Sequence, residues 1–478
     1  MTSAVDAPAI ERWQVLAAVH AASRAVGSGI YLGQGHAGWA WAGPERSTLV
    51  LGPSRSGKTS SFVVPNVLAA PGAVVSTSTK ADVLAHTESS RRTAGCSLLY
   101  DPSGTVHLPP GTDRVGWSPT TLADDWEIAL QVADAMVRSA GGRRAGAPSL
   151  TGDDHWTERA VALLAPLLHA AALDKTPMAG VLHWVDRHDG SPALSILSSA
   201  GGDRAAATDV LAGILSTEGR EQSGIWSTAS GVLGAYRSKA ALASTEPPYL
   251  DADTFCAGPN SLYICAAGRR QQLLAPLVVG LLTDVRDAAY RRAAHQPGGG
   301  FPPVLLALDE VANIAPIPDL PAIVTEGAGQ GLLTLACLQD LSQGRARWGR
   351  EAEAFVSLFG TTVVLPGIAD MPTLEALSAL GGDVEIPTRT VGHALGPSGK
   401  ILPSVSVSGT MRRRLPVDAI GCGREGQALV VDTRNRMGWV KLTPAHFAEP
   451  WAALSRGAER SADRSRSVAE MARHGRGR

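Results

Sequence analysis

The chain has 478 residues, of which 44% are hydrophobic and 18% are charged. This length exceeds what one hydrophobic core usually serves, so we expect more than one structural unit, and the composition excludes a largely disordered chain. The formal net charge is −1, which provides no overall basic excess. Any contact with nucleic acid must therefore rest on local clusters of cations.

The cysteines and the longest apolar runs exclude two further classes of protein. Five cysteines lie far apart and form no CxxC pair, which disfavours a disulfide framework or a zinc site. The longest apolar runs, Ala160–Leu173 and Leu273–Leu282, are shorter than the roughly 18 residues that span a bilayer, and the N-terminus does not resemble a signal peptide. We expect a cytoplasmic protein, with peripheral attachment to the inner face of the cell membrane as an open alternative.

Short apolar runs rich in β-branched residues recur along the chain and predict strands. They lie at Ser47–Gly52, Ala73–Ser78, Ser97–Asp101, Ser261–Ala267, Val304–Glu310, Leu332–Gln339, Thr361–Gly367 and Gln427–Thr433. Continuous apolar strands are typical of a mainly parallel sheet that is buried on both faces. Between them, residues 121–244 show apolar residues at helical spacing instead. The pattern predicts an α/β fold with an inserted all-α domain.

These patterns divide the chain into four parts. We expect an N-terminal segment, 1–44, an α/β domain built from 45–120 and 245–450, an all-α insert, 121–244, and an Arg-rich tail, 451–478. Between Arg456 and Arg478 the tail has seven arginines against three acidic residues, a net charge of +4. A segment of this kind is expected to be disordered or a frayed helix.

A phosphate-binding loop is predicted at "GPSRSGKTS", residues 52–60. Gly52, Gly57, Lys58 and Thr59 match the GxxxxGK[ST] pattern between a predicted strand and a predicted helix. Glycines let successive backbone N–H groups turn toward phosphate oxygens, and the helix adds its positive end. Lys58 would bridge the β- and γ-phosphates of ATP, and the Thr59 hydroxyl would ligate Mg²⁺. The candidate nucleotide-binding residues are Gly52, Pro53, Ser54, Arg55, Ser56, Gly57, Lys58, Thr59 and Ser60.

An acidic pair ends the predicted strand "PVLLALDE" and matches a Walker B pattern. Asp309 would hold Mg²⁺ through water, and Glu310 would polarise the attacking water. Adjacent carboxylates at this position are typical of ATPases with a RecA-like core. Gln339 ends the next strand and could sense the γ-phosphate at the same sheet edge. A turn-capping role for the acidic pair, and a turn amide at Gln339, are the structural alternatives.

These motifs resemble those of the type IV coupling proteins, the TraG/TraD-like conjugative DNA-transfer ATPases. The resemblance covers Ser47–Pro444 and includes "STSTKADVL" with Lys80 and Asp82, "DHWTERAVALLAPLL" and "RRRLPVDAIGCGREGQALVV". It implies a RecA-like P-loop NTPase core, a homo-hexameric ring that forms around DNA, and ATP with Mg²⁺ at the site. It also implies that the chain feeds relaxase-bound single-stranded DNA, or protein substrates, into a secretion channel; double-stranded DNA is not excluded.

The chain departs from this family's pattern in two places. Members usually begin with transmembrane helices, whereas here about 45 residues precede the core and none can span a bilayer, so membrane attachment stays open. Gly329 stands where many members have arginine, which leaves the arginine that acts between subunits undetermined. The candidates are Arg345, Arg347 and Arg350, although surface solvation is the commoner role of such residues.

Local cation clusters and alternative functions complete the sequence-based hypotheses. Arg143 with Arg144, and Arg412–Arg414, are candidate DNA contacts, and each cluster could equally be a solvated loop. One alternative function is a soluble FtsK/HerA-like DNA translocase. Another is an ATP-gated platform that recruits secretion substrates and turns over slowly.

Overall fold

The computed structural model describes residues 11–141, 152–199, 204–266, 271–295, 300–395, 401–432 and 436–455. Its centre is a twelve-stranded sheet in the order β2-β1-β14-β13-β10-β3-β9-β8-β4-β7-β5-β6. From β10 to β6 all neighbouring strands are parallel. The expectation of an α/β fold with a mainly parallel sheet is therefore confirmed.

The parallel strands form the middle and one side of the sheet. They are β10 (Thr361–Val364), β3 (Thr48–Leu51), β9 (Leu332–Leu338), β8 (Val304–Leu308), β4 (Val74–Ser78), β7 (Ser261–Cys265), β5 (Ser97–Tyr100) and β6 (Asp113–Arg114). Most of them are buried along their whole length, as expected for strands covered on both faces. All of them except the two-residue β6 correspond to apolar runs that predict strands.

Four antiparallel strands extend the other side of the sheet. They are β13 (Gln427–Asp432), β14 (Met437–Lys441), β1 (Tyr31–Gly35) and β2 (Gly38–Trp41). The strands β1 and β2 lie within residues 1–44, which the sequence sets apart as a separate N-terminal segment. Gln34 of β1 pairs with Lys441 of β14, so opposite ends of the described chain meet in one sheet.

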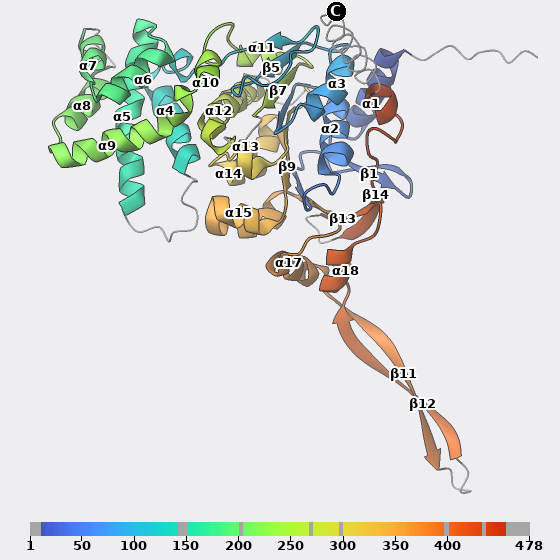
Figure 1. The fold of residues 1–478 in the computed structure, drawn as a ribbon. Coiled ribbons are helices and arrows are strands. Elements are labelled where there is room, and N and C mark those ends of the chain that lie inside the picture. Colours follow the sequence, from blue (N-terminus) through green and yellow to red (C-terminus); the bar gives the residue numbers. More distant parts are fainter. Residues whose placement is uncertain are drawn as a thin grey trace, which may run out of the picture.

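Helices cover both faces of the sheet (Figure 1). On one face lie α1 (Arg12–Ala25), α2 (Val64–Ala69) and α3 (Asp82–Arg91), whose apolar residues share a core with Val50. On the other face, residues of α12 (Gln271–His295), α13 (Val311–Ile314) and α14 (Leu320–Glu326) share a core with Leu49 and Leu51. Successive side chains of β3 point to opposite faces of the sheet, so this strand contributes apolar side chains to both cores.

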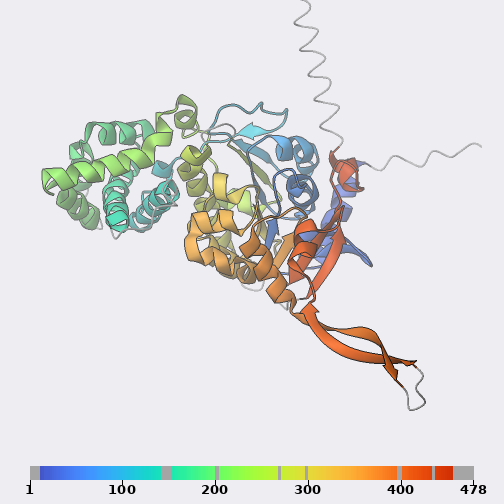
Figure 2. The same ribbon diagram turned by 60° about the horizontal axis from the view of Figure 1, so that its bottom comes forward.

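The residues between β6 and β7 form a helical lobe beside the sheet (Figures 1 and 2). Its helices are α4 (Trp126–Gly141), α5 (Gly152–Asp174), α6 (Met178–Arg187), α7 (Ser191–Ser198), α8 (Ala205–Leu215), α9 (Gly219–Val232) and α10 (Lys239–Ala243), whereas α11 (Ala252–Ala257) lies beside β5 and β7 of the sheet (Figure 1). Short 3₁₀ turns lie at Pro119–Thr121 and Leu233–Arg237.

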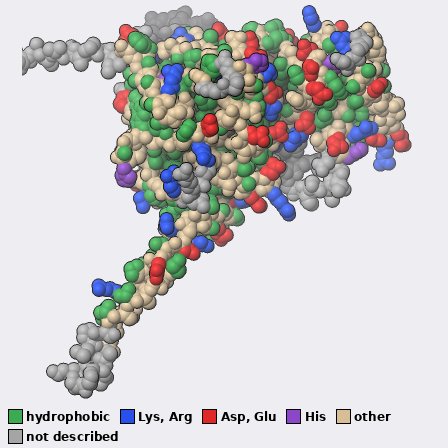
Figure 3. Space-filling model, turned by 180° about the vertical axis from the view of Figure 1, so that it is seen from behind, with side chains coloured by type: hydrophobic (Ala, Val, Ile, Leu, Met, Phe, Trp, Pro, Cys, Tyr) green, Lys and Arg blue, Asp and Glu red, His purple; other side chains and the backbone are tan. Residues whose placement is uncertain are grey.

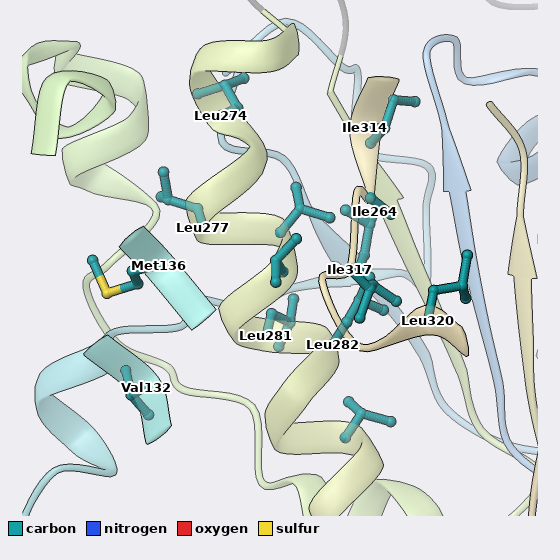
Figure 4. Close-up of a cluster of buried hydrophobic side chains, with 14 of the residues drawn as sticks. Val132, Met136, Ile264, Leu274, Leu277, Leu281, Leu282, Ile314, Ile317 and Leu320 are labelled. Atoms are coloured by element: carbon teal, nitrogen blue, oxygen red, sulfur yellow. The ribbon is translucent and has the colours of Figure 1, made fainter. Parts of the chain in front are cut away.

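The long helix α12 joins this lobe to the sheet. Figure 4 shows Leu277 and Leu281 of α12 facing Met136 of α4, while Ile317 and Leu320 lie on the side of α12 toward the sheet. One continuous hydrophobic core therefore runs from the lobe into the sheet. Among the described residues, no helix is both long enough and apolar enough to cross a lipid bilayer.

Several short helices in the chain after β8 lie near the carboxyl ends of the parallel strands. This part of the chain contains η6 (Gly327–Gln330), α15 (Leu341–Trp348), η7 (Gly349–Ala354), α16 (Phe355–Leu358), α17 (Met371–Gly381) and α18 (Val417–Cys422). Between α17 and α18 lies a two-stranded hairpin, β11 (Asp383–Leu395) and β12 (Ile401–Arg413). The hairpin projects away from the rest of the molecule in both views (Figures 1 and 2) and was not expected from the sequence.

The beginning of the predicted C-terminal tail is part of the folded core. Residues 451–455 are helical, and Trp451 and Leu454 are fully buried. The rings of Trp451 and Trp39 of β2 stack with their centroids 5.6 Å apart, so this segment is anchored to the sheet edge. The expectation of a disordered or frayed tail from residue 451 is therefore wrong for 451–455. The arginines from Arg456 onward lie outside the described residues.

Candidate active site

The order of three parallel strands brings the predicted motifs together at the carboxyl ends of these strands. In that order β9 lies between β3 and β8, with Leu338 paired to Leu51 and Ala336 paired to Leu308. Because parallel strands end at the same edge, the residues that follow them lie together there. Gly52, Gln339 and Asp309 are the residues at these three strand ends, and the Gly52 N–H donates to the Leu338 carbonyl at 3.2 Å.

The phosphate loop has the backbone geometry that its glycines allow. Gly57 has φ +92°, and a Cβ at Gly52 would lie 2.9 Å from the Cβ of Leu365. Arg55 also lies in the left-handed region, at φ 64°. Lys58 is 8% exposed, and its ammonium donates to the carbonyls of Gly52 at 2.5 Å and Pro53 at 2.9 Å. The cation is therefore held at the mouth of the loop.

The first turn after the loop is a π-helical turn, Thr59–Val63, rather than the expected α-helix. The Ser61 N–H donates to the Gly57 carbonyl at 2.9 Å, and α2 follows directly. Turns of this kind are rare in proteins, and those that occur are often found at functional sites. Here the turn sets the direction of the Thr59 side chain.

Asn66 fixes this helix to the N-terminal strand β1. Its Oδ1 accepts a hydrogen bond from the Tyr31 N–H at 2.7 Å, and its Nδ2 donates to the carbonyls of Tyr31 and Phe62, each at 2.9 Å. Because the Asn66 side chain is buried, these bonds take the place of the hydrogen bonds that its amide would make to water. Nothing in the sequence pattern singles out Asn66, since its partners become visible only in the folded chain.

Thr59 and Asp309 meet at the centre of the site. The Thr59 hydroxyl donates to Oδ2 of Asp309 at 2.6 Å. Burial raises the pKa of the Asp309 carboxyl, and the hydrogen bond from Thr59 opposes this shift. A hydroxyl and a carboxylate oxygen are the donor set that Mg²⁺ takes at such sites, so these two residues fit the predicted metal.

Glu310 has an unusual backbone conformation beside this pair. Its φ of 53° and ψ of 50° are left-handed, which is uncommon for a residue with a Cβ. The Asn313 amide donates to its Oε2 at 3.3 Å. Strain of this kind concentrates at functional sites, where the surrounding structure holds the residue in place. The turn directs Glu310 away from the line of strand β8.

Gln339 follows β9 and begins the connection to α15. Its N–H donates to Oε1 of Gln343 at 3.0 Å, while Asp340 caps α15 by accepting from the Ser342 N–H at 2.9 Å. Asn313 and Gln343 line a cavity of about 200 Å³, together with Arg347. The residue that could respond to a γ-phosphate is thus attached to a helix that borders this cavity.

The structure separates the three candidate arginines of the α15 region. Arg345 pairs with Asp370 at 2.8 Å, and Arg347 donates to the Ser139 carbonyl of α4 at 2.7 Å. Arg350 is exposed and makes no ion pair within the part of the chain that the structure describes. Arg350 is therefore the one of these three that is available to another subunit.

The other candidate cations are placed as follows. Lys80 is exposed just beyond the end of β4, the neighbour of β8. Arg412–Arg414 lie exposed at the base of the hairpin, where Arg413 pairs with Asp383 at 3.3 Å. Arg143 and Arg144 lie outside the described residues.

The sheet order and the meeting of the phosphate loop with the acidic pair define a P-loop nucleotide-binding protein with a RecA-like α/β fold. The family model described as type IV secretory system conjugative DNA transfer matches residues 12–399. The chain belongs to this family, and the family expected from the motifs is confirmed. A comparison with curated proteins gave no match.

Solved structures of a bacterial conjugative coupling protein, TrwB, share the fold. An unbound TrwBdeltaN70 form has a TM-score of 0.62 at 18% identity, over 85% of this chain and 87% of that chain. TrwB with the ATP analogue ADPNP has a TM-score of 0.61 at 18% identity, with the same coverage. TrwB with ADP and Mg²⁺ has a TM-score of 0.59 at 19% identity, again over 85% and 87%.

Proposed function

We propose that this protein is an ATP-driven coupling protein that recruits DNA and moves it toward a type IV secretion channel. The observation that carries the proposal is the contact between Thr59 and Asp309, because it joins the phosphate loop to the acidic pair at one sheet edge. Membership of the conjugative DNA transfer family supports DNA as the cargo. TrwB structures of the same fold hold ATP analogues or ADP with Mg²⁺, which supports these ligands here.

Each residue of the site has a proposed role. The loop from Gly52 to Ser60 binds the phosphates through its N–H groups, with Lys58 on the β- and γ-phosphates. Thr59, and Asp309 through water, would hold Mg²⁺, which would supply positive charge next to the phosphates. Glu310 orients the attacking water and accepts its proton, and Gln339 senses the γ-phosphate.

We propose that the protein acts as a homo-hexameric ring in which Arg350 reaches the nucleotide site of the next subunit. A cation supplied from a neighbour stabilises negative charge that develops during phosphoryl transfer. Arg350 fits this role better than Arg345 and Arg347, since both of these are engaged within their own chain. Ring assembly on DNA would couple hydrolysis to DNA binding.

The proposed partners are single- or double-stranded DNA, a relaxase attached to it, and proteins of the secretion channel. Arg412–Arg414 and Arg143 with Arg144 are the candidate DNA contacts, because a neutral chain must concentrate its cations locally. The proposed place of action is the cytoplasmic side of the inner membrane, where ATP and the DNA to be transferred are found.

The test is ATP turnover with single-stranded DNA, double-stranded DNA and no DNA, at low and high salt. We expect DNA to raise turnover and added salt to remove the effect, because phosphate contacts are screened. Lys58→Ala should abolish nucleotide binding, whereas Glu310→Gln should bind ATP and fail to hydrolyse it. Turnover that ignores every DNA at low salt would contradict a DNA motor. DNA transfer that survives Glu310→Gln would favour the ATP-gated platform.

A further inference from the structure

The hairpin β11–β12 is a long arm, and no other element of the described part of the chain covers its length (Figure 1). Its strands have 13 residues each and pair in continuous register from Asp383↔Arg413 to Leu395↔Ile401, without a bulge. At about 3.3 Å per residue the arm reaches roughly 40 Å. An isolated two-stranded hairpin is at best marginally stable in water, so an arm of this length calls for a partner.

The two faces of the arm differ in chemistry. Because directly paired residues share a face, Val391, Val405, Val407 and Met411 lie on one face together, and each is more than half exposed; the charged residues Glu385 and Arg389 also lie on this face, nearer the base. The opposite face is hydroxyl-rich and has Thr388, Thr390, Ser406, Ser408 and Thr410. Figure 3 shows hydrophobic side chains along the projecting arm, which is unusual for a surface in contact with water.

The outer edges of the arm are open. Among the described residues each strand pairs only with the other, so each leaves one row of backbone N–H and C=O groups without a strand partner there. Natural proteins guard such edges with charges, prolines or bulges. From Thr388 to Val391, and in the paired stretch Val405–Ser408, the arm has no proline, no bulge and a single charged residue, Arg389, whereas Glu385, Pro387 and Arg412 lie nearer its base. These edges are therefore suited to strand pairing.

The arm is connected to the phosphate loop through the helix α17. It follows β10 and α17, and this connection contacts the phosphate loop, since a Cβ at Gly367 would lie 3.1 Å from Cγ of Pro53. In the proposed ring this edge of the sheet faces the neighbouring subunit, because Arg350 must arrive there. The arm thus begins where a second copy is required.

We propose that the occupant of the arm is the same arm of a second copy of this chain. The outer edge of β11 in one copy pairs with the outer edge of β12 in the next, a head-to-tail contact that a ring can repeat. The apolar faces then continue from copy to copy, and so do the Ser/Thr faces. DNA is the less suitable occupant of the outer part of the arm, because Arg389 is the only cation in the two stretches named above, whereas the candidate DNA contacts Arg412–Arg414 lie at the base of the arm.

The inference rests on the proposed ring, and a shortened arm tests it. Removing Pro387–Gly409 and joining Ile386 to Thr410 through Asn-Gly keeps the base of the hairpin and supplies a favourable tight turn. With an ATP analogue and Mg²⁺, we expect mass photometry to show assembly of the full chain at a concentration about tenfold or more below that of the shortened chain. Identical assembly of the two chains would overturn the inference.

Nucleotide binding separates this inference from the proposed function. The arm contains none of the residues of the nucleotide site, so the shortened chain should bind a fluorescent ATP analogue as the full chain does. A full chain that fails to bind the analogue contradicts the proposed function. A full chain that binds it, while the shortened chain assembles normally, contradicts the arm contact alone.

Crosslinking between two populations of chains tests the contact directly. In a background with Cys96→Ser and Cys422→Ser, one population has Thr390→Cys and the other has Ser406→Cys. Each chain then has one exposed thiol, so a short bis-maleimide can join arms only between chains. We expect the yield of crosslinked mixed dimers to be well above the yield obtained when both populations have Ser195→Cys instead. Ser195 is an exposed position on α7. Arm crosslinking at that control level would overturn the inference. Arm thiols that become shielded from the maleimide only when DNA is added would also overturn it.

Discussion

The hydroxyl of Thr59 and the carboxylate of Asp309 are joined by a hydrogen bond of 2.6 Å, although 250 positions separate them in the sequence. This bond spans the two motifs that together hold a triphosphate and its metal. It therefore provides the most direct place to perturb the site without disturbing the sheet.

Replacing Thr59 by alanine should weaken Mg²⁺-dependent nucleotide binding by about 10- to 100-fold, because one oxygen ligand and its partner bond to Asp309 are lost. Thr59→Ser keeps the hydroxyl and is the matched control, which should bind close to the native level. Titration of a fluorescent ATP analogue, with and without Mg²⁺, measures both. Equal Mg²⁺ dependence in the two variants would argue against a metal at this position.

Arg91 should be one of the most important residues for stability. Its buried guanidinium donates to the carbonyls of Ala70, Gly72, Pro259 and Asn260 and to the hydroxyl of Ser261. Arg91→Ala leaves these buried acceptors unsatisfied and should lower the free energy of unfolding by about 3–5 kcal/mol.

The neighbouring Arg92 provides the control for Arg91. Its side chain is 48% exposed and pairs with Glu88 one helical turn away. Glu88 is buried, so Arg92→Ala should be somewhat destabilising, but less so than Arg91→Ala, because the guanidinium of Arg92 is half exposed and has one buried carboxylate as its partner. Denaturant unfolding of both variants gives the comparison, and similar losses would show that the buried network is not what stabilises the domain.

The buried carboxyl of Asp284 should make stability depend on pH. Burial raises the pKa of Asp284 to about 6. The folded protein then binds more protons than the unfolded chain between roughly pH 4 and 6, so stability falls as pH rises through this window. Asp284→Asn should stabilise the protein by about 1–3 kcal/mol at pH 7.5, and this gain should disappear near pH 4.

Asp287, one turn further along α12, is the control for this effect. It is partly exposed and pairs with Arg286 at 2.7 Å, so Asp287→Asn should not stabilise the protein at pH 7.5. Thermal unfolding measured from pH 4 to pH 8 distinguishes the two variants. A gain for Asp284→Asn that is constant with pH would exclude titration as its cause.

Glu310 should illustrate a conflict between stability and activity. Glycine adopts its left-handed conformation without a Cβ penalty, whereas glutamate pays about 1–2 kcal/mol. Glu310→Gly should therefore be at least as stable as the native protein and yet fail to hydrolyse ATP. Glu310→Val, which is β-branched, should be clearly less stable. Unfolding temperatures and turnover of the two variants check this expectation.

Local patterns were sufficient for the middle of the fold. Apolar β-branched runs predict strands β3, β4, β5, β7, β8, β9, β10 and β13, because each of these strands is buried by helices or by neighbouring strands. The phosphate loop and the acidic pair lie at strand ends, so parallel pairing brings them together as expected. Their catalytic roles stay predictions until turnover is measured.

Other features depend on contacts that no local pattern contains. Strands β1, β2 and β14 are short and contain glycine, and the contact between β1 and β14 joins distant parts of the chain. Asn66 and Arg91 act on backbone groups of distant segments. The hairpin did leave a signal, the alternation of Val and Ser from Val405 to Ser408, but the face that the two valines form has no partner among the described residues.

The pairing of β1 with β14 has a consequence for synthesis on the ribosome. Tyr31, at the start of β1, is held by Asn66, by the Thr443 hydroxyl and by the ring of Trp451. These last partners are translated more than 400 residues after Tyr31. Until they leave the exit tunnel, β1 has no neighbour on that side and exposes an unpaired strand edge. The nascent chain therefore has this open strand edge during most of its synthesis, and β1, to which Asn66 fixes the helix after the phosphate loop, gains its last partners only when translation is nearly complete.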